Sequence, residues 1–405
     1  MTQKNQNENW KRYAWFGLIV IILPFLISIY TSLWIYSAIT IGFLFGFFLQ
    51  KGQLCGSSAF SEVIIMKDRK KLWGLWVAIV TGMGIFAIGS TTGLHSLTVK
   101  PLLILNMIIG GIIFGAGTVL AGGCVSGCLY KSGEGNLNSI VALIGIAFGI
   151  SSVEYGHLHG INMWMKKTAV IKTVSGGSVS ISSLTGLPYW ILAFIFIVIT
   201  IFATIYVNKK SRQTSSGMTF VPEKASFEKI MTKRWKPWQA GIAIGLLGFL
   251  AYMSSSASGR NYPLGVSHGV LFVHNITTAN DYQNIYKPKL TIENKTLESE
   301  RLSPKPKRKV VWWLVLLVSS LVLGSWVSAQ MSGDVKLLPK PPDQILFAIL
   351  GGVFVGIGAA IAGGCVVGNI ISGWALMSVG CLIFGIFTLL ANWAMTWFYL
   401  MGGWE

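Results

Sequence analysis

Charged residues are scarce in this 405-residue chain: they make up 11% of it, while hydrophobic residues make up 53%. With a mean hydropathy of +0.62, the composition excludes a soluble fold, so we predict an integral membrane protein. The apolar stretches are continuous and do not alternate with polar residues, which excludes a transmembrane β-barrel. The first stretch lacks a small-residue cleavage site, so we expect a retained helix and not a signal peptide.

Nucleotide and metal motifs are also absent. No G-x-x-x-x-G-K-[ST] occurs, so this chain does not itself use ATP. Neither H-E-x-x-H nor C-x-x-C occurs, and His157 and His159 fall in a predicted loop, so we predict no metal site and no cofactor. Few ionisable residues fall within the apolar stretches, so the sequence names no coupling ion and leaves facilitated passage and symport both open.

The net charge of +18 comes from basic clusters between the apolar stretches, at 67–71, 209–212, 233–236 and 305–309. This pattern is a topology signal, and we expect no nucleic-acid partner. A cytoplasmic N-terminus places the larger share of Lys and Arg inside, so we expect both termini in the cytoplasm. The expected location is the plasma membrane of a prokaryote, with the lipid bilayer around a multi-pass protein.

Ten apolar stretches are long enough to cross a bilayer of about 30 Å, and we predict an all-α membrane protein of about ten helices. They lie near 13–30, 32–50, 73–90, 102–120, 137–153, 188–207, 237–253, 311–329, 344–362 and 374–399.

The chain is duplicated. Residues 110–127, GGIIFGAGTVLAGGCVSG, reappear at 351–368 as GGVFVGIGAAIAGGCVVG, with 10 of 18 positions identical. Five predicted crossings separate the loops after the two copies, so the copies face opposite sides and the repeat is inverted. Transporters built from inverted repeats bind their substrate between the halves.

We therefore divide the chain into three parts. Residues 1–155 form the N-terminal membrane half, with a repeat core at 32–155, and 156–236 hold a connecting helix and a basic linker. Residues 237–405 form the C-terminal membrane half and contain a polar insert at 276–309.

Each copy ends an apolar helix at Ala-Gly-Gly-Cys, with Gly122, Gly123 and Cys124 in the first and Gly363, Gly364 and Cys365 in the second. Paired glycines let the chain turn back, and the short apolar segments that follow are typical of re-entrant half-helices. The free N–H groups of such a half-helix suit an anion beside the thiol. The earlier glycines of each copy, in contrast, are predicted to be helix-packing positions: Gly115, Gly117, Gly356 and Gly358.

A third turn of this kind contains Cys55, and its expected counterpart in the second half contains Arg260 in place of a thiol. Arg260 is either a membrane-interface residue or an anion ligand. Cys128 and Cys381 are predicted to be small packing residues, and Glu134, between two glycines, either pins its turn or relays protons.

These residues resemble the YeeE/YedE family of membrane proteins, whose characterised members are thiosulfate importers. The resemblance is carried by the turn from Cys55 to Phe60, the run from Phe114 to Cys124, the Gly259-Arg260 turn and the Ala362–Cys365 turn. It implies that Cys55, Cys124 and Cys365 line one central path, with re-entrant helices entering from both faces. It also implies a small cytoplasmic sulfur-carrier protein as a partner.

The sequence thus predicts a membrane importer of thiosulfate or a similar small sulfur-containing anion, and not an enzyme. The predicted substrate-binding residues are Cys55, Cys124, Cys365, Gly122, Gly123, Gly363, Gly364 and Arg260. Some relatives are linked to selenium metabolism, so a selenium-compound transporter stays open. So does a membrane sulfurtransferase with persulfide cysteines, although such an enzyme needs an activated thiolate beside a base or cation.

Overall fold

The computed structural model describes residues 3–93, 99–168, 170–171, 178–214, 227–278, 281–286, 308–335 and 341–402. Within these residues the chain is helical apart from two small two-stranded sheets, which confirms the predicted all-α membrane class. Nine described segments are long and apolar enough to cross a membrane. The tenth predicted stretch, near 188–207, corresponds to a helix whose described apolar part, Tyr189–Ile205, is shorter.

The elements follow one another as sequence patterns of apolar stretches and turns predict. The first part contains α1 (Gln3–Thr31), α2 (Ser37–Gly52), α3 (Gly56–Ile65), α4 (Lys70–Thr91), β1 (Leu102–Leu103), α5 (Ile104–Leu120), α6 (Val125–Gly133) and α7 (Leu137–Glu154). The connecting part contains α8 (His159–Thr168), β2 (Val170–Ile171), α9 (Ile181–Thr185), α10 (Tyr189–Thr214) and α11 (Phe227–Thr232). The last part contains α12 (Pro237–Ala257), α13 (Ser267–Thr278), β3 (Gln283–Ile285), β4 (Lys309–Val311), α15 (Trp312–Ser332), α16 (Pro342–Ile361), η1 (Val366–Ile371), α17 (Ser372–Ala375) and α18 (Val379–Leu400).

The short strands tie connections together. β1 pairs antiparallel with β2, with Leu102 opposite Ile171, and β3 pairs parallel with β4, with Gln283 opposite Lys309. The second pair spans the predicted insert, of which residues 287–307 lie outside the described part of the chain.

The long helices of the two halves pair with each other. α2 packs on α15, α4 on α12, α5 on α18 and α7 on α16, while α5 also contacts α16 and α2 contacts α12. Under the repeat, the α2–α15 contact corresponds to the α12–α4 contact and the α5–α18 contact to the α16–α7 contact, so these long-helix contacts match as a duplicated chain should show. The three-part division and the inversion of the repeat stay predictions.

Glycines allow these helices to approach closely. A Cβ at Gly115 on α5 would meet the α18 backbone at Thr388, and one at Gly117 would lie 2.7 Å from the backbone nitrogen of Val355 on α16. Gly358 on α16 approaches α5 in the same way, and Gly356 approaches α7. Any larger side chain would separate the helices, so these four positions have the packing role predicted for them.

The loop at 67–71, before α4, and the insert at 276–309, next to β4, adjoin opposite ends of the helix bundle. The Lys51 carbonyl at the end of α2 accepts a hydrogen bond from the backbone N–H of Trp235, just before α12, and its ammonium donates to Ser332 Oγ at the end of α15. The start of α4 lies at this same end, since Gly74 packs on Pro237 of α12. β4, at the edge of the insert, joins the opposite end of α15.

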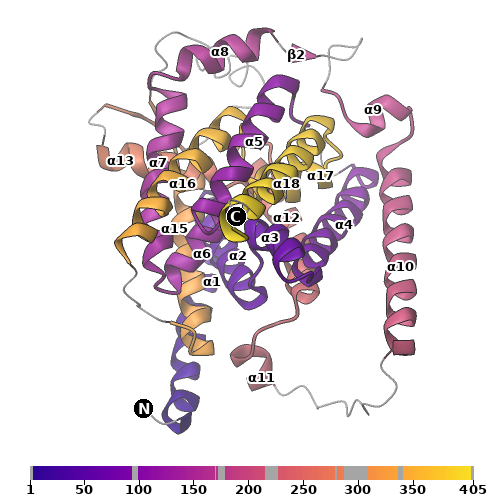
Figure 1. Cartoon of the computed structure of the whole chain (residues 1–405). Helices are drawn as coiled ribbons and strands as arrows, with labels where there is room; N and C mark the ends of the chain where they lie inside the picture. The colour runs from indigo at the N-terminus through magenta and orange to yellow at the C-terminus, as the bar shows by residue number, and fades with distance from the viewer. Residues whose placement is uncertain are drawn as a thin grey trace.

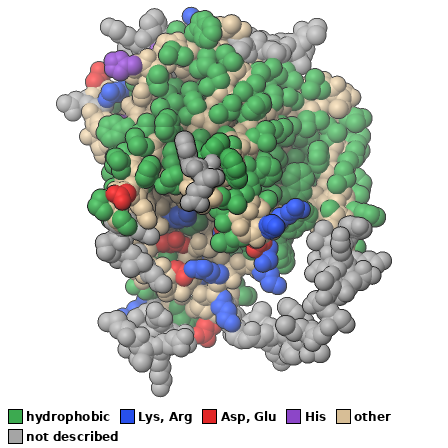
Figure 2. Space-filling view, in the orientation of Figure 1, with side chains coloured by type: hydrophobic (Ala, Val, Ile, Leu, Met, Phe, Trp, Pro, Cys, Tyr) green, Lys and Arg blue, Asp and Glu red, His purple; other side chains and the backbone are tan. Residues whose placement is uncertain are grey.

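The outer surface suits a bilayer. Figure 2 shows apolar side chains over a broad area, with many of the visible charged side chains gathered below it. α10, at the right edge of Figure 1, exposes Phe194 and Phe202, and α1 exposes Ile19 and Leu23. Apolar side chains on peripheral helices are stable against lipid and not against water, so the protein is a multi-pass membrane protein.

Candidate functional site

The three predicted cysteine turns share one local structure. Cys55, Cys124 and Cys365 are each the residue directly before a short helix, α3, α6 and η1 respectively. All three have extended backbone, with φ values of −117°, −80° and −98°. A residue in this position holds its side chain beside the first, unpaired N–H groups of the helix.

The folded chain brings these turns together. The Cys55 and Cys124 sulfur atoms lie 3.8 Å apart, and all three thiols are completely buried. A Cβ at Gly56 would lie 2.7 Å from the side chain of Val366, the residue after Cys365. The first turns of α3 and η1 therefore touch, although they are more than three hundred residues apart in the sequence.

The paired glycines of the two Ala-Gly-Gly-Cys turns have distinct roles. Gly122 and Gly363 have φ values of +67° and +64°, a left-handed conformation that glycine adopts without strain, and a Cβ at either would meet no atom within 4 Å. Their neighbours are crowded: a Cβ at Gly123 would lie 3.3 Å from the Cys128 sulfur, and one at Gly364 would lie 2.9 Å from the Lys100 ammonium nitrogen. The first glycine of each pair thus allows the left-handed turn. The second leaves room for a neighbouring side chain, Cys128 at Gly123 and Lys100 at Gly364.

The end of α6 binds the Cys55 turn. Gln53, which has a left-handed φ of +48°, donates from Nε2 to the Glu134 carboxylate at 2.7 Å, and Gln50 donates to the same oxygen at 3.3 Å. Burial raises the pKa of the Glu134 carboxyl, although the two amide donors act in the opposite direction. Of the two roles considered for Glu134, this geometry supports pinning the turn.

Comparison with known proteins identifies the family. A protein-family profile described as Sulphur transport matches residues 51–394, which is most of the chain. The chain belongs to the sulphur transport family.

Relatives that are named as transporters support this family assignment. It is 30% identical to the thiosulfate transporter TsuA of Spirochaeta thermophila over 374 residues, which cover 90% of this chain and 98% of the relative. It is also 30% identical to the thiosulfate transporter TsuA of Escherichia coli over 365 residues, which cover 90% of this chain and 94% of the relative. A shorter match to the probable transporter YedE of Escherichia coli is 33% identical over 121 residues, 29% of each protein. The predicted YeeE/YedE resemblance is confirmed.

Two residues at the second Ala-Gly-Gly-Cys turn, called the second turn below, were not predicted from the sequence: Lys100 and Asn369. Lys100 donates to the Gly363 carbonyl at 2.8 Å and to Asn369 Oδ1 at 2.7 Å. The Asn369 amide donates in turn to the Gly364 carbonyl at 2.9 Å. The internal repeat contained a signal for Asn369, because it occupies the position that Cys128 has in the first copy. Nothing in the sequence marks Lys100, which belongs to the α4–α5 connection.

Arg260 lies next to this second turn. Its guanidinium stands 5.2 Å from the Trp313 ring and 5.9 Å from the Tyr262 ring, and it donates to the Pro263 carbonyl at 3.1 Å. The Tyr262 hydroxyl donates to the carbonyl of Gly368 in η1 at 2.7 Å, which links the Arg260 loop to the half-helix. Arg260 thus faces the protein interior, as an anion ligand requires.

The two cysteines predicted to be packing residues are buried behind the turns. Cys128 lies against Gly123, as described above, and the Cys381 sulfur lies 3.8 Å from Asn369 Oδ1. Within the described ranges no three His, Cys, Asp or Glu side chains are grouped as a metal site would need.

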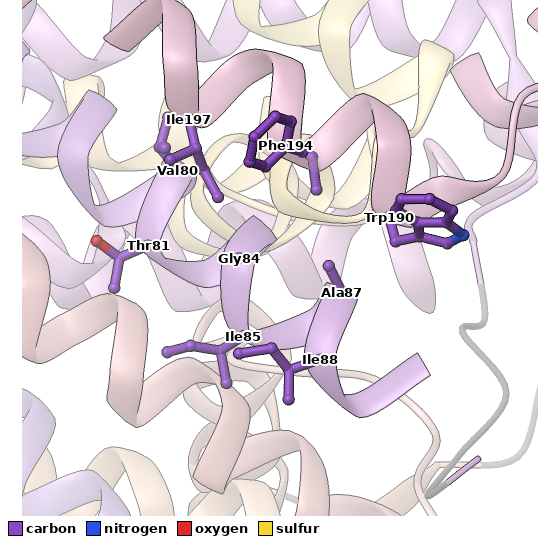
Figure 3. A pocket seen from close by; sticks show the side chains of 10 residues that line it. Val80, Thr81, Gly84, Ile85, Ala87, Ile88, Trp190, Phe194 and Ile197 are labelled. Atoms are coloured by element: carbon purple, nitrogen blue, oxygen red, sulfur yellow. The ribbon is translucent and has the colours of Figure 1, made fainter. Parts of the chain in front are cut away.

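A separate, mostly apolar crevice lies between α4 and α10, with Thr81 among its lining residues (Figure 3). It has a volume of about 620 Å³, and its lining includes Ile85 and Ile88 of α4 with Trp190 and Phe194 of α10. An anion would lose its hydration there and gain few hydrogen bonds, so this crevice suits hydrocarbon and not an anion.

Proposed function

We propose that this protein imports thiosulfate, or a similar small sulfur-containing anion, across the plasma membrane of a prokaryote. The observation that carries the proposal is the convergence of buried thiols at the starts of short helices, with the Cys55 and Cys124 sulfur atoms 3.8 Å apart. The names of the two long relatives, both thiosulfate transporters, support the substrate. In this proposal Cys55, Cys124 and Cys365 line one central path.

The chemistry of the thiols fits such a substrate. A neutral thiol is a weak, polarisable donor, which matches a polarisable terminal sulfur better than it matches the oxygens of sulfate. A thiolate would repel a dianion, and apolar surroundings favour the neutral form. The oxygen-bearing end of the anion is then left for the backbone N–H groups around Gly122, Gly123, Gly363 and Gly364 and for the positive charge of Arg260.

Transport fits the site better than sulfur transfer catalysed by an enzyme. A persulfide-forming cysteine needs a base or a cation next to its sulfur. The contacts of the Cys124 sulfur are the Cys55 thiol and the Ser126 hydroxyl at 3.4 Å, neither of which is a base. Lys100 does place a cation at the Cys365 turn, so the proposal of a non-enzymatic role rests on the Cys55–Cys124 pair and on the transporter names of the two long relatives. We propose a small cytoplasmic sulfur-carrier protein as the acceptor inside the cell.

Uptake of labelled thiosulfate into proteoliposomes tests the proposal directly. Purified protein should accumulate label above empty vesicles, and unlabelled thiosulfate should compete better than sulfate or selenite. Stronger competition by selenite would favour the selenium-compound alternative. Equal uptake by empty and protein-containing vesicles would contradict the transport function.

The proposed topology has a separate test. Residues 67–71 should be cytoplasmic and the 284–309 part of the insert external, with both termini inside. Single cysteines introduced into each loop can be labelled with an impermeant maleimide in intact cells. Labelling of both loops from one side would contradict the inverted repeat, whereas exchanged sides would contradict only the orientation.

A further inference from the structure

The Lys100 ammonium is held at the second turn by neutral groups alone. Its nitrogen donates to the Gly363 carbonyl at 2.8 Å and to Asn369 Oδ1 at 2.7 Å, and it stands 4.8 Å from the centre of the Tyr262 ring. Neither an amide oxygen nor an aromatic face carries the full negative charge that would neutralise an ammonium.

No acidic partner completes this environment. In the described part of the chain, the ion pairs of Asp and Glu go to Lys70, Lys71, Arg234 and His268, and Lys100 contacts none of these acids. A second cation, Arg260, approaches the same Tyr262 ring. Burial lowers the pKa of the Lys100 ammonium, as expected for a cation without a counter-ion. Among the described residues, the Lys100 ammonium at the second turn therefore has no acidic counter-ion.

Asn369 fixes the position of this charge. Its amide nitrogen donates to the carbonyls of Gly364 at 2.9 Å and Ala362 at 3.4 Å, so its oxygen is turned toward Lys100. Gly364 leaves room for both groups, since a Cβ there would lie 2.8 Å from the Asn369 oxygen and 2.9 Å from the Lys100 nitrogen. Cys365 follows Gly364 in the sequence, so the ammonium lies against the residue that directly precedes the Cys365 thiol.

The first turn differs in this respect. Lys131 donates to the Gly122 carbonyl at 2.7 Å, just as Lys100 donates to Gly363, but this contact is exposed to solvent. Glu134 follows three residues later and supplies a nearby negative charge. Water and a carboxylate screen Lys131, whereas Lys100 has neither an acidic partner nor full access to solvent.

We propose that Lys100, held by Asn369, is the counter-charge of the transported oxyanion at the second turn. The ammonium binds the oxygen-bearing end of the anion while the adjacent Cys365 thiol contacts its sulfur end. This inference rests on the proposed transport function and adds to it the residue that compensates the substrate's charge. No covalent step is involved.

Lys100→Gln tests the charge while it keeps a polar side chain. The apparent KM for thiosulfate uptake should rise roughly 10- to 100-fold, the change expected when a hydrogen bond to a charged group is lost. Lys100→Arg, which keeps the charge, should retain much more of the affinity. The matched control is Lys70→Gln, which removes one positive charge from an exposed ion pair with Asp68 at the other end of the bundle. Its KM should stay within about twofold of the parent value.

Asn369→Asp provides a second test in which Lys100 is still present. A carboxylate at this position would lie beside the ammonium and neutralise it, so thiosulfate affinity should fall about as far as in Lys100→Gln. This variant answers the question even if Lys100→Gln does not fold. A parental KM in Asn369→Asp or in a folded Lys100→Gln would overturn the inference.

Anion binding distinguishes this inference from the proposed function. Thermal unfolding in detergent is measured with thiosulfate, sulfate or chloride, for the parent and for Lys100→Gln. A parent that does not transport thiosulfate, but is stabilised by another oxyanion only when Lys100 is present, would contradict the substrate and keep the site. Thiosulfate uptake with equal stabilisation and equal KM in parent and variant would contradict the site and keep the substrate. Stabilisation lost in the variant with an unchanged KM would show a structural anion only and would also overturn the inference.

Discussion

The two Ala-Gly-Gly-Cys turns have the same backbone and different side chains. In both, a left-handed glycine, Gly122 or Gly363, makes the turn, and a lysine ammonium donates to its carbonyl. In both, an extended cysteine precedes a short helix. Duplication thus preserved the turn geometry, which depends on glycine and on the start of a helix.

The side chains around the turns have diverged. Four residues after the cysteine, the first copy has Cys128 and the second has Asn369. The first turn also lies against a second thiol, Cys55, whereas the second lies against Lys100 and Tyr262. The half-helices differ too, since α6 is an α-helix and η1 has the wider π-helical turn. The first turn therefore lies beside a second thiol, and the other lies beside a partly buried lysine and an aromatic ring.

The largest expected effect tests what the turns have in common. Cys124→Ala and Cys365→Ala should each reduce thiosulfate uptake to background, a fall of roughly 100-fold, because each removes a proposed substrate contact. Expression and thermal stability should stay near those of the parent. Cys381→Ala, behind the second turn, should be mild by the same uptake assay. Equal damage from Cys381→Ala and Cys365→Ala would remove the distinction between turn thiols and packing thiols.

The next effect tests whether sulfur itself matters at the first turn. Cys124→Ser keeps a small hydrogen-bond donor but loses the polarisable atom, so most thiosulfate uptake should be lost without a gain in sulfate uptake. Initial rates with each labelled anion provide the measurement. Uptake near the parental rate would instead assign recognition to the backbone N–H groups around Gly122 and Gly123.

A moderate effect compares the two turn glycines. Ala at Gly122 or at Gly363 would meet no neighbouring atom, so the expected loss of roughly 1–2 kcal/mol in unfolding free energy comes from the left-handed backbone alone. Asn, which tolerates this conformation, should be less destabilising at both positions. Chemical or thermal unfolding in detergent can compare the four variants. If one Ala variant were neutral and the other severe, the two turns would not be equivalent in backbone.

The smallest expected effect concerns Glu134, the acid that lies near the first Ala-Gly-Gly-Cys turn. Because burial raises the pKa of Glu134 above 4.5, its carboxyl binds a proton more tightly in the folded protein. Its stabilising contribution is complete below the unfolded pKa and is lost as the pH rises through the folded pKa. Glu134→Gln should therefore reduce the fall of the parent's Tm across this range, by a few degrees. A parent and variant with the same Tm slope between about pH 4 and 7 would contradict this role.

Much of the fold was predictable because it depends on local sequence. Continuous apolar stretches gave the membrane helices, and the repeated glycines gave both the packing positions and the turns at Gly122 and Gly363. The stretch near 188–207 likewise forms a helix, α10.

The candidate site was only partly predictable because its polar contacts are long-range. Lys100 and the Gly363 carbonyl are 263 positions apart, and hydropathy carries no information on which loop residue reaches which turn. The sequence places Arg260 in a turn beside a predicted helix, but its position over Trp313 and Tyr262 depends on how α12, α13 and α15 assemble. Asn369 was accessible in principle, through its alignment with Cys128.

The pairing of helices across the halves also affects the order of assembly. α5 and α7 present glycine-lined faces to α16 and α18, which are synthesised much later than α5 and α7. Until those helices are inserted, lipid must cover faces that are shaped for another helix. The first half thus has incompletely packed faces until those helices are inserted. Insertion of α16 and α18 covers these faces of α5 and α7. A truncation that removed α16 and α18 would therefore leave the faces exposed to lipid, even with every residue of the first half intact.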